Sequence, residues 1–151
     1  MSNKTLRDLV GWTQQFHREI AESIELAATQ TNNEREQMLF GYLAGHENEL
    51  IQMIDRYGEN ASDKALNTWV SAYLEQYPSV EQPPRHPSFN GMDTADIMNT
   101  VQEQHGRIVN IYEHLEDFVQ SSAHELVSDI RHLEEQTLLR ISQAANRLED
   151  I

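Results

Sequence analysis

The sequence contains no cysteine among its 151 residues. Disulfide bonds, thiolate nucleophiles and cysteine-ligated zinc or iron–sulfur sites are therefore excluded. Long apolar runs are missing too, since no stretch approaches the roughly 18–20 apolar residues that a membrane-spanning helix needs. The first residues also lack the apolar core of a secretory signal. We therefore expect a cytoplasmic protein that does not bind membranes.

Positive charge is scarce. The chain has 11 Lys and Arg residues against 25 Asp and Glu residues, which gives a net charge of −14. Such a surface repels nucleic acid and anionic membranes, so neither is expected as a partner. A glycine-rich phosphate loop, a GxSxG elbow and a basic stripe are also absent. These absences argue against nucleotide binding and serine hydrolysis.

Apolar residues recur with helical periodicity in four long segments, and no segment shows strand alternation. We predict an all-α fold in which residues 1–151 form one four-helix-bundle domain. Short loops make the helices of each pair antiparallel, and a long crossover at 58–92 joins the two hairpins. The crossover contains a short helix at about 63–76, followed by a proline-rich stretch. The expected core helices span about 4–29, 32–57, 93–120 and 123–149.

Local signals place some helix ends. Two segments match the capping-box pattern, Thr31–Glu34 and Ser122–Glu125, and predict the starts of the second and fourth core helices. Gly58 follows the second apolar stripe and predicts a left-handed C-cap there.

Each core helix carries one histidine or glutamate inside its apolar stripe: His17, Glu47, His105 and Glu134. The spacing from His17 to His105 is 88 positions (105 − 17), and that from Glu47 to Glu134 is 87 (134 − 47). At a rise of about 1.5 Å per residue, all four fall within roughly one helical turn of a common level. The sequence therefore predicts one polar layer that crosses an apolar core.

Buried charges must be paired or must bind a metal, so two interpretations stand. In the first, the four residues bind a divalent cation, because imidazole and carboxylate suit Fe²⁺, Mn²⁺ and Zn²⁺. In the second, each histidine pairs with a glutamate in a metal-free network. His46 adjoins Glu47 and is an additional candidate ligand, and Tyr112 is a candidate to hydrogen-bond with the layer.

The pattern resembles the ferritin-like superfamily, which includes rubrerythrin-type proteins. The resemblance covers nearly all of the chain. The segment Leu43–Leu50 is similar in its residue types to the second helix of rubrerythrin-like domains. It implies a site for iron or manganese used in oxidation, peroxide reduction or iron storage. It also implies a homo-oligomer, since dimers are common in such folds.

The ligand set departs from that superfamily. Its pattern supplies Glu from the first and third helices and Glu-x-x-His from the second and fourth. In this chain, His17 and His105 stand where the first and third helices are expected to supply Glu. Leu50 and Thr137 stand where the histidines of the Glu-x-x-His motifs are expected. A single-metal site, or a bundle that has lost its metal, is favoured over a di-iron centre. An enzyme of this type would use an open coordination position to activate oxygen, peroxide or water.

A different class of function stays open alongside these. The short crossover helix carries Trp69, Tyr73 and Leu74, which are candidates for a contact surface because buried aromatic side chains anchor protein interfaces. Alternatively, these residues simply pack across the end of the bundle. The alternative prediction is a non-catalytic interaction module in which the buried layer holds no metal.

Overall fold

The structure is a computed structural model that describes residues 4–85 and 87–149. No strand forms within these residues, and the predicted all-α class is confirmed. An isolated antiparallel bridge pairs Thr5 with Trp69. The helices are α1 (Leu6–Gln30), α2 (Glu34–Asn60), α3 (Asp63–Leu66), α4 (Ser71–Leu74), the 3₁₀ turn η1 (Pro78–Glu81), α5 (Thr94–Phe118) and α6 (Ser121–Glu149).

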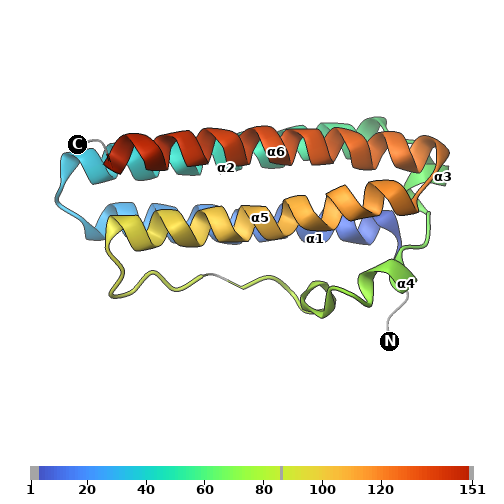
Figure 1. Cartoon of the computed structure of the whole chain (residues 1–151), viewed down its shortest axis with the longest axis horizontal. Helices are drawn as coiled ribbons and strands as arrows, with labels where there is room; N and C mark the ends of the chain where they lie inside the picture. Colours follow the sequence, from blue (N-terminus) through green and yellow to red (C-terminus); the bar gives the residue numbers. More distant parts are fainter. Residues whose placement is uncertain (1–3, 86, 150–151) are drawn as a thin grey trace.

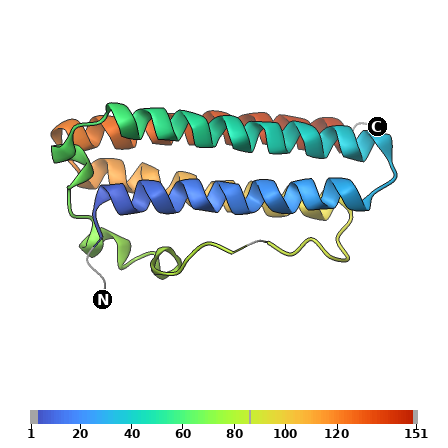
Figure 2. The ribbon, with the colours of Figure 1, turned by 180° about the vertical axis from the view of Figure 1, so that it is seen from behind.

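The four long helices form two packed pairs, α1 with α2 and α5 with α6, and α2 also packs against α6. Figures 1 and 2 show them side by side, with α2 and α6 in one layer and α1 and α5 in the other. The short turns between α1 and α2 and between α5 and α6 make each pair antiparallel, as the sequence predicts. Within the described residues, no helix is both long and apolar enough to cross a membrane.

The helix starts are fixed by side chains that accept otherwise unpaired backbone N–H groups. Thr5 and Asp8 form a reciprocal capping box at α1, and Asp93 accepts the N–H of Asp96 at α5. At α2 the cap is Asn33, not Thr31. The predicted box at Thr31 is therefore wrong, because the Thr31 hydroxyl donates to Glu36 and the Asn33 side chain takes the capping position.

Two other predicted helix ends are also wrong. Helix α2 continues through Gly58 to Asn60, so Gly58 is not a left-handed cap. Helix α6 begins at Ser121, whose φ is +56°, and the N–H of His124 bonds to the carbonyl of Gln120. The expected cap residue Ser122 therefore lies inside the helix, because the chain turns one residue earlier than the pattern predicts.

The single crossover helix expected at 63–76 is also wrong. Backbone hydrogen bonds join Leu6 to the carbonyl of Thr68 at 2.8 Å and Val70 to the carbonyl of Lys4 at 2.9 Å. These bonds hold the middle of the segment in an extended path beside the start of α1. The helix is therefore divided into the single turns α3 and α4.

The remainder of the connection runs along the layer of α1 and α5 (Figures 1 and 2). Trp12 of α1 donates its indole N–H to the carbonyl of Gln82 at 2.9 Å. Arg107 of α5 donates to the hydroxyl of Ser79 at 2.9 Å, and Val80 between them is buried. These contacts fasten the crossover to both helices and cover the outer side of their apolar stripes.

Candidate metal centre

His17, Glu47, His105 and Glu134 meet in the middle of the core, and each has an exposed fraction of 0%. They come from α1, α2, α5 and α6, one from each long helix. The layers on either side are apolar; Ile20, Leu43, Ile108 and Ile130 are among the buried residues of the same helices. The sequence therefore predicted the polar layer correctly.

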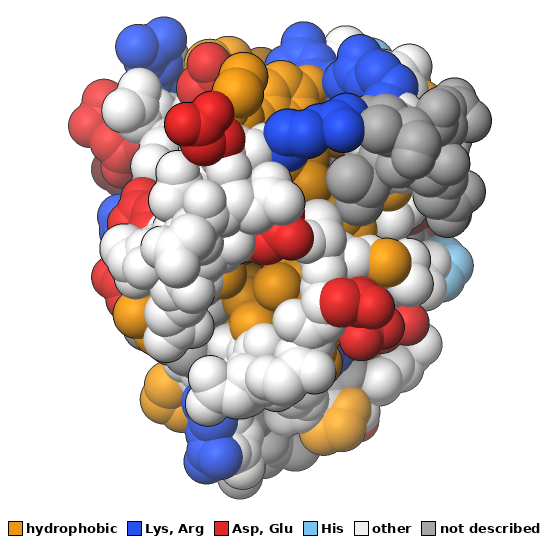
Figure 3. Space-filling view, turned by 90° about the vertical axis from the view of Figure 1, so that its left-hand side faces the viewer, with side chains coloured by type: hydrophobic (Ala, Val, Ile, Leu, Met, Phe, Trp, Pro, Cys, Tyr) orange, Lys and Arg blue, Asp and Glu red, His pale blue; other side chains and the backbone are white. Residues whose placement is uncertain are grey.

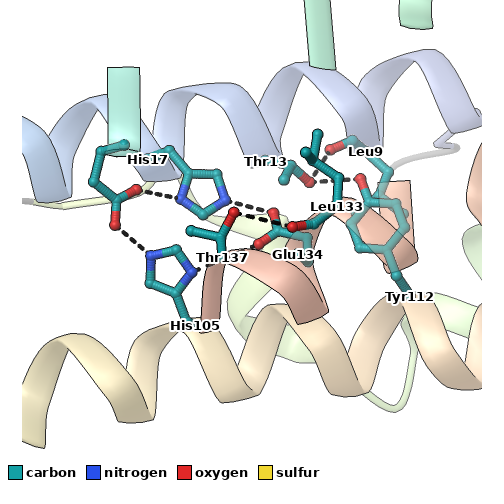
Figure 4. A network of polar contacts seen from close by, with 9 residues as sticks. Leu9, Thr13, His17, His105, Tyr112, Leu133, Glu134 and Thr137 are labelled. Atoms are coloured by element: carbon teal, nitrogen blue, oxygen red, sulfur yellow. Dashed lines mark hydrogen bonds and ion pairs between the residues drawn. The ribbon is translucent and has the colours of Figure 1, made fainter. Parts of the chain in front are cut away.

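The four side chains form a nearly closed ring of contacts. Nδ1 of His17 lies 2.8 Å from Oε2 of Glu47, and Nε2 of His17 lies 2.6 Å from Oε1 of Glu134. Nε2 of His105 contacts Oε1 of Glu47. The last contact is longer, with 3.7 Å between Nδ1 of His105 and Oε2 of Glu134. Figure 4 shows His17 and His105 turned toward each other beside Glu134, with these contacts as dashed lines.

Hydrogen-bond chemistry sets the proton count of this ring. A carboxylate only accepts, so a ring nitrogen that bonds to one must carry a proton. Both nitrogens of His17 face carboxylates at hydrogen-bond distance, which requires an imidazolium. A second imidazolium at His105 would make the layer neutral with its two carboxylates.

The electrostatics agree with that count. Burial alone would lower the pKa of His17, but the charges of Glu134 and Glu47 and their hydrogen bonds outweigh it and raise the pKa to about 10. The same balance, dominated by Glu47, raises the pKa of His105 to about 9. Burial would raise the pKa of Glu47, yet the two histidines lower it to about 2. They also lower the pKa of Glu134. Without a metal, the layer holds two ion pairs at neutral pH.

One side of the ring is not satisfied by these pairs. Nδ1 of His105 and Oε2 of Glu134 are buried and lack a hydrogen-bond partner. Their separation of 3.7 Å is too long for a hydrogen bond. An unpaired buried polar group costs about 1–3 kcal/mol. Hydrogen bonds among the four side chains therefore do not satisfy every polar atom of the layer.

The opposite side of the ring has the geometry of a cation site. One ligand atom each from His17, Glu47 and His105 lies within 4.8 Å of the others. Ligand atoms at about 2.0–2.2 Å from one cation lie within roughly 4.4 Å of each other, so small side-chain shifts suffice. The three residues could therefore hold a metal ion. Glu134 lies outside this three-residue group. It faces Nε2 of His17 and Nδ1 of His105, whereas Glu47 contacts the other nitrogen of each ring.

His46 is not brought to the layer. Its Nδ1 lies 3.8 Å from the exposed carboxylate of Glu49, and its ring packs edge-on against Tyr42 with centroids 4.4 Å apart. It is absent from the group of described residues that could hold a metal. The structure thus joins the four stripe residues and leaves the fifth predicted ligand on a neighbouring face of α2.

A second buried polar contact lies near the layer. The hydroxyls of Thr13 and Tyr112 are 2.7 Å apart and wholly buried. Thr13 donates to the carbonyl of Leu9, so Tyr112 donates to Thr13 (Figure 4). The sequence suggested Tyr112 as a partner of the layer and missed Thr13. The available signal was a threonine one turn before His17 in the same stripe.

A surface hollow of about 970 Å³ opens at the end of the molecule where α1 turns into α2. Figure 3 views this end and shows hydrophobic side chains at the floor of the hollow. Its lining includes Ala27, Phe40, Ile97 and Ala144, but none of the four layer residues. The hollow and the polar layer are therefore separate features.

Comparisons of the chain with protein-family models, with curated proteins and with solved structures found no match.

Proposed function

We propose that this protein is a divalent-metal-binding helical bundle of the ferritin-like type, with its cation held in the buried His/Glu layer. The observation that carries the proposal is the convergence of His17, Glu47 and His105, from three helices, within 4.8 Å in a fully buried position. Two imidazoles and a carboxylate are a ligand set suited to Fe²⁺, Mn²⁺ or Zn²⁺. Three protein ligands also leave further coordination positions for water or a substrate.

Charge supports the same proposal. A cation of charge +2 with two neutral imidazoles and two carboxylates makes a neutral layer, as two imidazolium ions do. The metal can therefore replace two protons without leaving net charge in the core, which avoids the large cost of an uncompensated buried ion. The unpaired Nδ1 of His105 and Oε2 of Glu134 indicate that the protons alone do not satisfy every polar atom.

Elemental analysis of freshly purified, untagged protein tests this proposal. We expect about one equivalent of Fe, Mn or Zn per chain, lost from a His17→Ala/His105→Ala variant. His124→Ala/His132→Ala is the matched control, because it removes two histidines outside the layer and should keep the metal. Finding no metal, even after anaerobic reconstitution with each cation, would show that the proposal is wrong.

A second candidate is an interaction module with a metal-free layer. The observation that favours it is the 64% exposure of Trp69 and the 51% exposure of Phe118, because large exposed aromatic side chains are common at interfaces. Tyr73 and Leu74, which the sequence assigned to the same surface, are instead buried, and the Tyr73 hydroxyl donates to the carbonyl of Ile111. Light scattering of the wild type and of Trp69→Ala tests this candidate and the expected dimer. A monomer in both samples, together with a partner profile that Trp69→Ala leaves unchanged, would show that this candidate is wrong.

A further inference from the structure

Glu134 differs from Glu47 in its relation to the two histidines. The carboxylate of Glu47 contacts Nδ1 of His17 and Nε2 of His105. Glu134 faces the remaining nitrogens, Nε2 of His17 at 2.6 Å and Nδ1 of His105 at 3.7 Å. Each imidazole therefore lies between the two carboxylates and turns one nitrogen toward each.

Metal ligation makes these two sides unequal. A histidine that binds a cation through one nitrogen keeps a proton on the other and usually donates it to a carboxylate or a carbonyl. If the cation lies on the Glu47 side, the remaining N–H groups are those of Nε2 in His17 and Nδ1 in His105. Glu134 is the carboxylate that both of these atoms face.

We infer that Glu134 is a positioning residue and not a ligand, an inference that rests on the proposed function. The cation is bound by Nδ1 of His17, Nε2 of His105 and the carboxylate of Glu47. Glu134 accepts the remaining N–H of both histidines. This assignment differs from the four-ligand site expected from the sequence. It holds the two histidines in opposite tautomers. It also gives Nδ1 of His105 and Oε2 of Glu134, unpaired in the metal-free ring, a partner in each other.

The distances favour this side of the ring over the other. The three ligand atoms that lie within 4.8 Å of one another belong to the group that contains Glu47 and not Glu134. Closing the gap of 3.7 Å between His105 and Glu134 requires a small rotation of the imidazole. The negative charge of Glu134 still neutralises the centre through its hydrogen bonds, so the core carries no net charge.

The histidine NMR spectrum of the Zn²⁺-loaded wild-type chain tests the inference without any substitution. Long-range ¹H–¹⁵N correlations distinguish a metal-bound ring nitrogen from a protonated one. We expect His17 to bind Zn²⁺ through Nδ1 with a proton on Nε2, and His105 to show the reverse. Binding of His17 through Nε2 would overturn the inference and leave metal binding intact. A wild type that binds neither Zn²⁺ nor, after anaerobic reconstitution, Fe²⁺ or Mn²⁺ would overturn both the inference and the proposed function.

Co²⁺ binding by two matched variants gives a second test. Glu134→Gln keeps an accepting oxygen but loses the charge, so we expect about 10–100-fold weaker binding with an unchanged Co²⁺ absorption spectrum. Glu134→Asp, which retains the carboxylate, should recover part of the affinity. Glu47→Gln removes a ligand and should alter the spectrum or abolish binding. A spectral change in Glu134→Gln equal to that in Glu47→Gln would show that Glu134 is a ligand.

Discussion

Nδ1 of His17 lies 2.8 Å from Oε2 of Glu47, and neither side chain has any exposed surface. An ion pair at this depth gains Coulomb energy but loses the hydration of both charges, so its net contribution to stability is small. Replacing only one of the two residues lowers stability much more, because it leaves the partner charged and buried without a counter-ion.

We therefore expect Glu47→Leu to lower the free energy of unfolding of the metal-free protein by about 3–5 kcal/mol. Replacing all four layer residues by Leu should leave stability unchanged or raise it by about 1–4 kcal/mol, because no charge then remains in the core. Urea unfolding measures both. A cost below about 1 kcal/mol for the single change would show that the layer is hydrated or flexible and not a packed ionic network.

The pKa shifts predict how stability depends on pH in the metal-free protein. The pKa of His17 rises from 6.5 to about 10, so its contribution is complete below pH 6.5 and is lost as pH rises through about 10. The pKa of Glu47 falls from 4.5 to about 2, so its contribution is complete above pH 4.5 and is lost as pH falls through about 2. The layer should therefore contribute most between pH 4.5 and 6.5.

Urea unfolding between pH 3 and pH 10 measures this dependence. The same series on the fourfold Leu variant is the control, because it keeps the surface carboxylates and removes the layer. The difference between the two curves should be flat near pH 5.5 and fall on both sides. A difference that keeps rising above pH 7 would contradict the assignment of two imidazolium ions.

The contact between Thr13 and Tyr112 predicts an asymmetry between two conservative substitutions. Tyr112→Phe removes the donor and leaves Thr13 bonded to the carbonyl of Leu9, so it should cost about 0.5–1.5 kcal/mol. Thr13→Val leaves the buried Tyr112 hydroxyl without its acceptor and should cost more, about 1–3 kcal/mol. The double variant should then cost less than the sum of the two. Equal and additive costs would show that the two hydroxyls do not depend on each other.

The cap of α2 gives a prediction on which sequence and structure differ. Asn33→Ala should lower the free energy of unfolding by about 1 kcal/mol, because the Asn33 side chain accepts the N–H groups of Arg35 and Glu36. Asn32→Ala is the matched control, since Asn32 is exposed and is not the cap residue. Thermal unfolding monitored by circular dichroism compares them. Equal effects would contradict the capping role of Asn33.

The structure shows which features of the fold and of the site could be predicted from the sequence. Positions such as His17 and Glu134 were found because an apolar stripe has a period, and one polar residue inside it is visible without coordinates. Which ring nitrogen faces which carboxylate depends on side-chain rotation, which periodicity does not encode. The breaks in the crossover helix were missed for a related reason. The backbone bonds from Leu6 to Thr68 and from Val70 to Lys4 join segments more than sixty residues apart, and no local pattern records them.

Burial of the layer finally predicts how a cation exchanges. All four side chains have 0% exposure, and the end hollow does not reach them, so a bound ion leaves only when the helices open locally. Removal by a strong chelator should therefore reach a rate that no longer rises with chelator concentration, because opening becomes limiting. Stopped-flow absorbance of the Co²⁺ form measures this rate. Mild urea should increase it, since opening exposes buried surface. A rate that stays proportional to chelator concentration, and is insensitive to urea, would mean that the chelator reaches the ion through an open path in the native state.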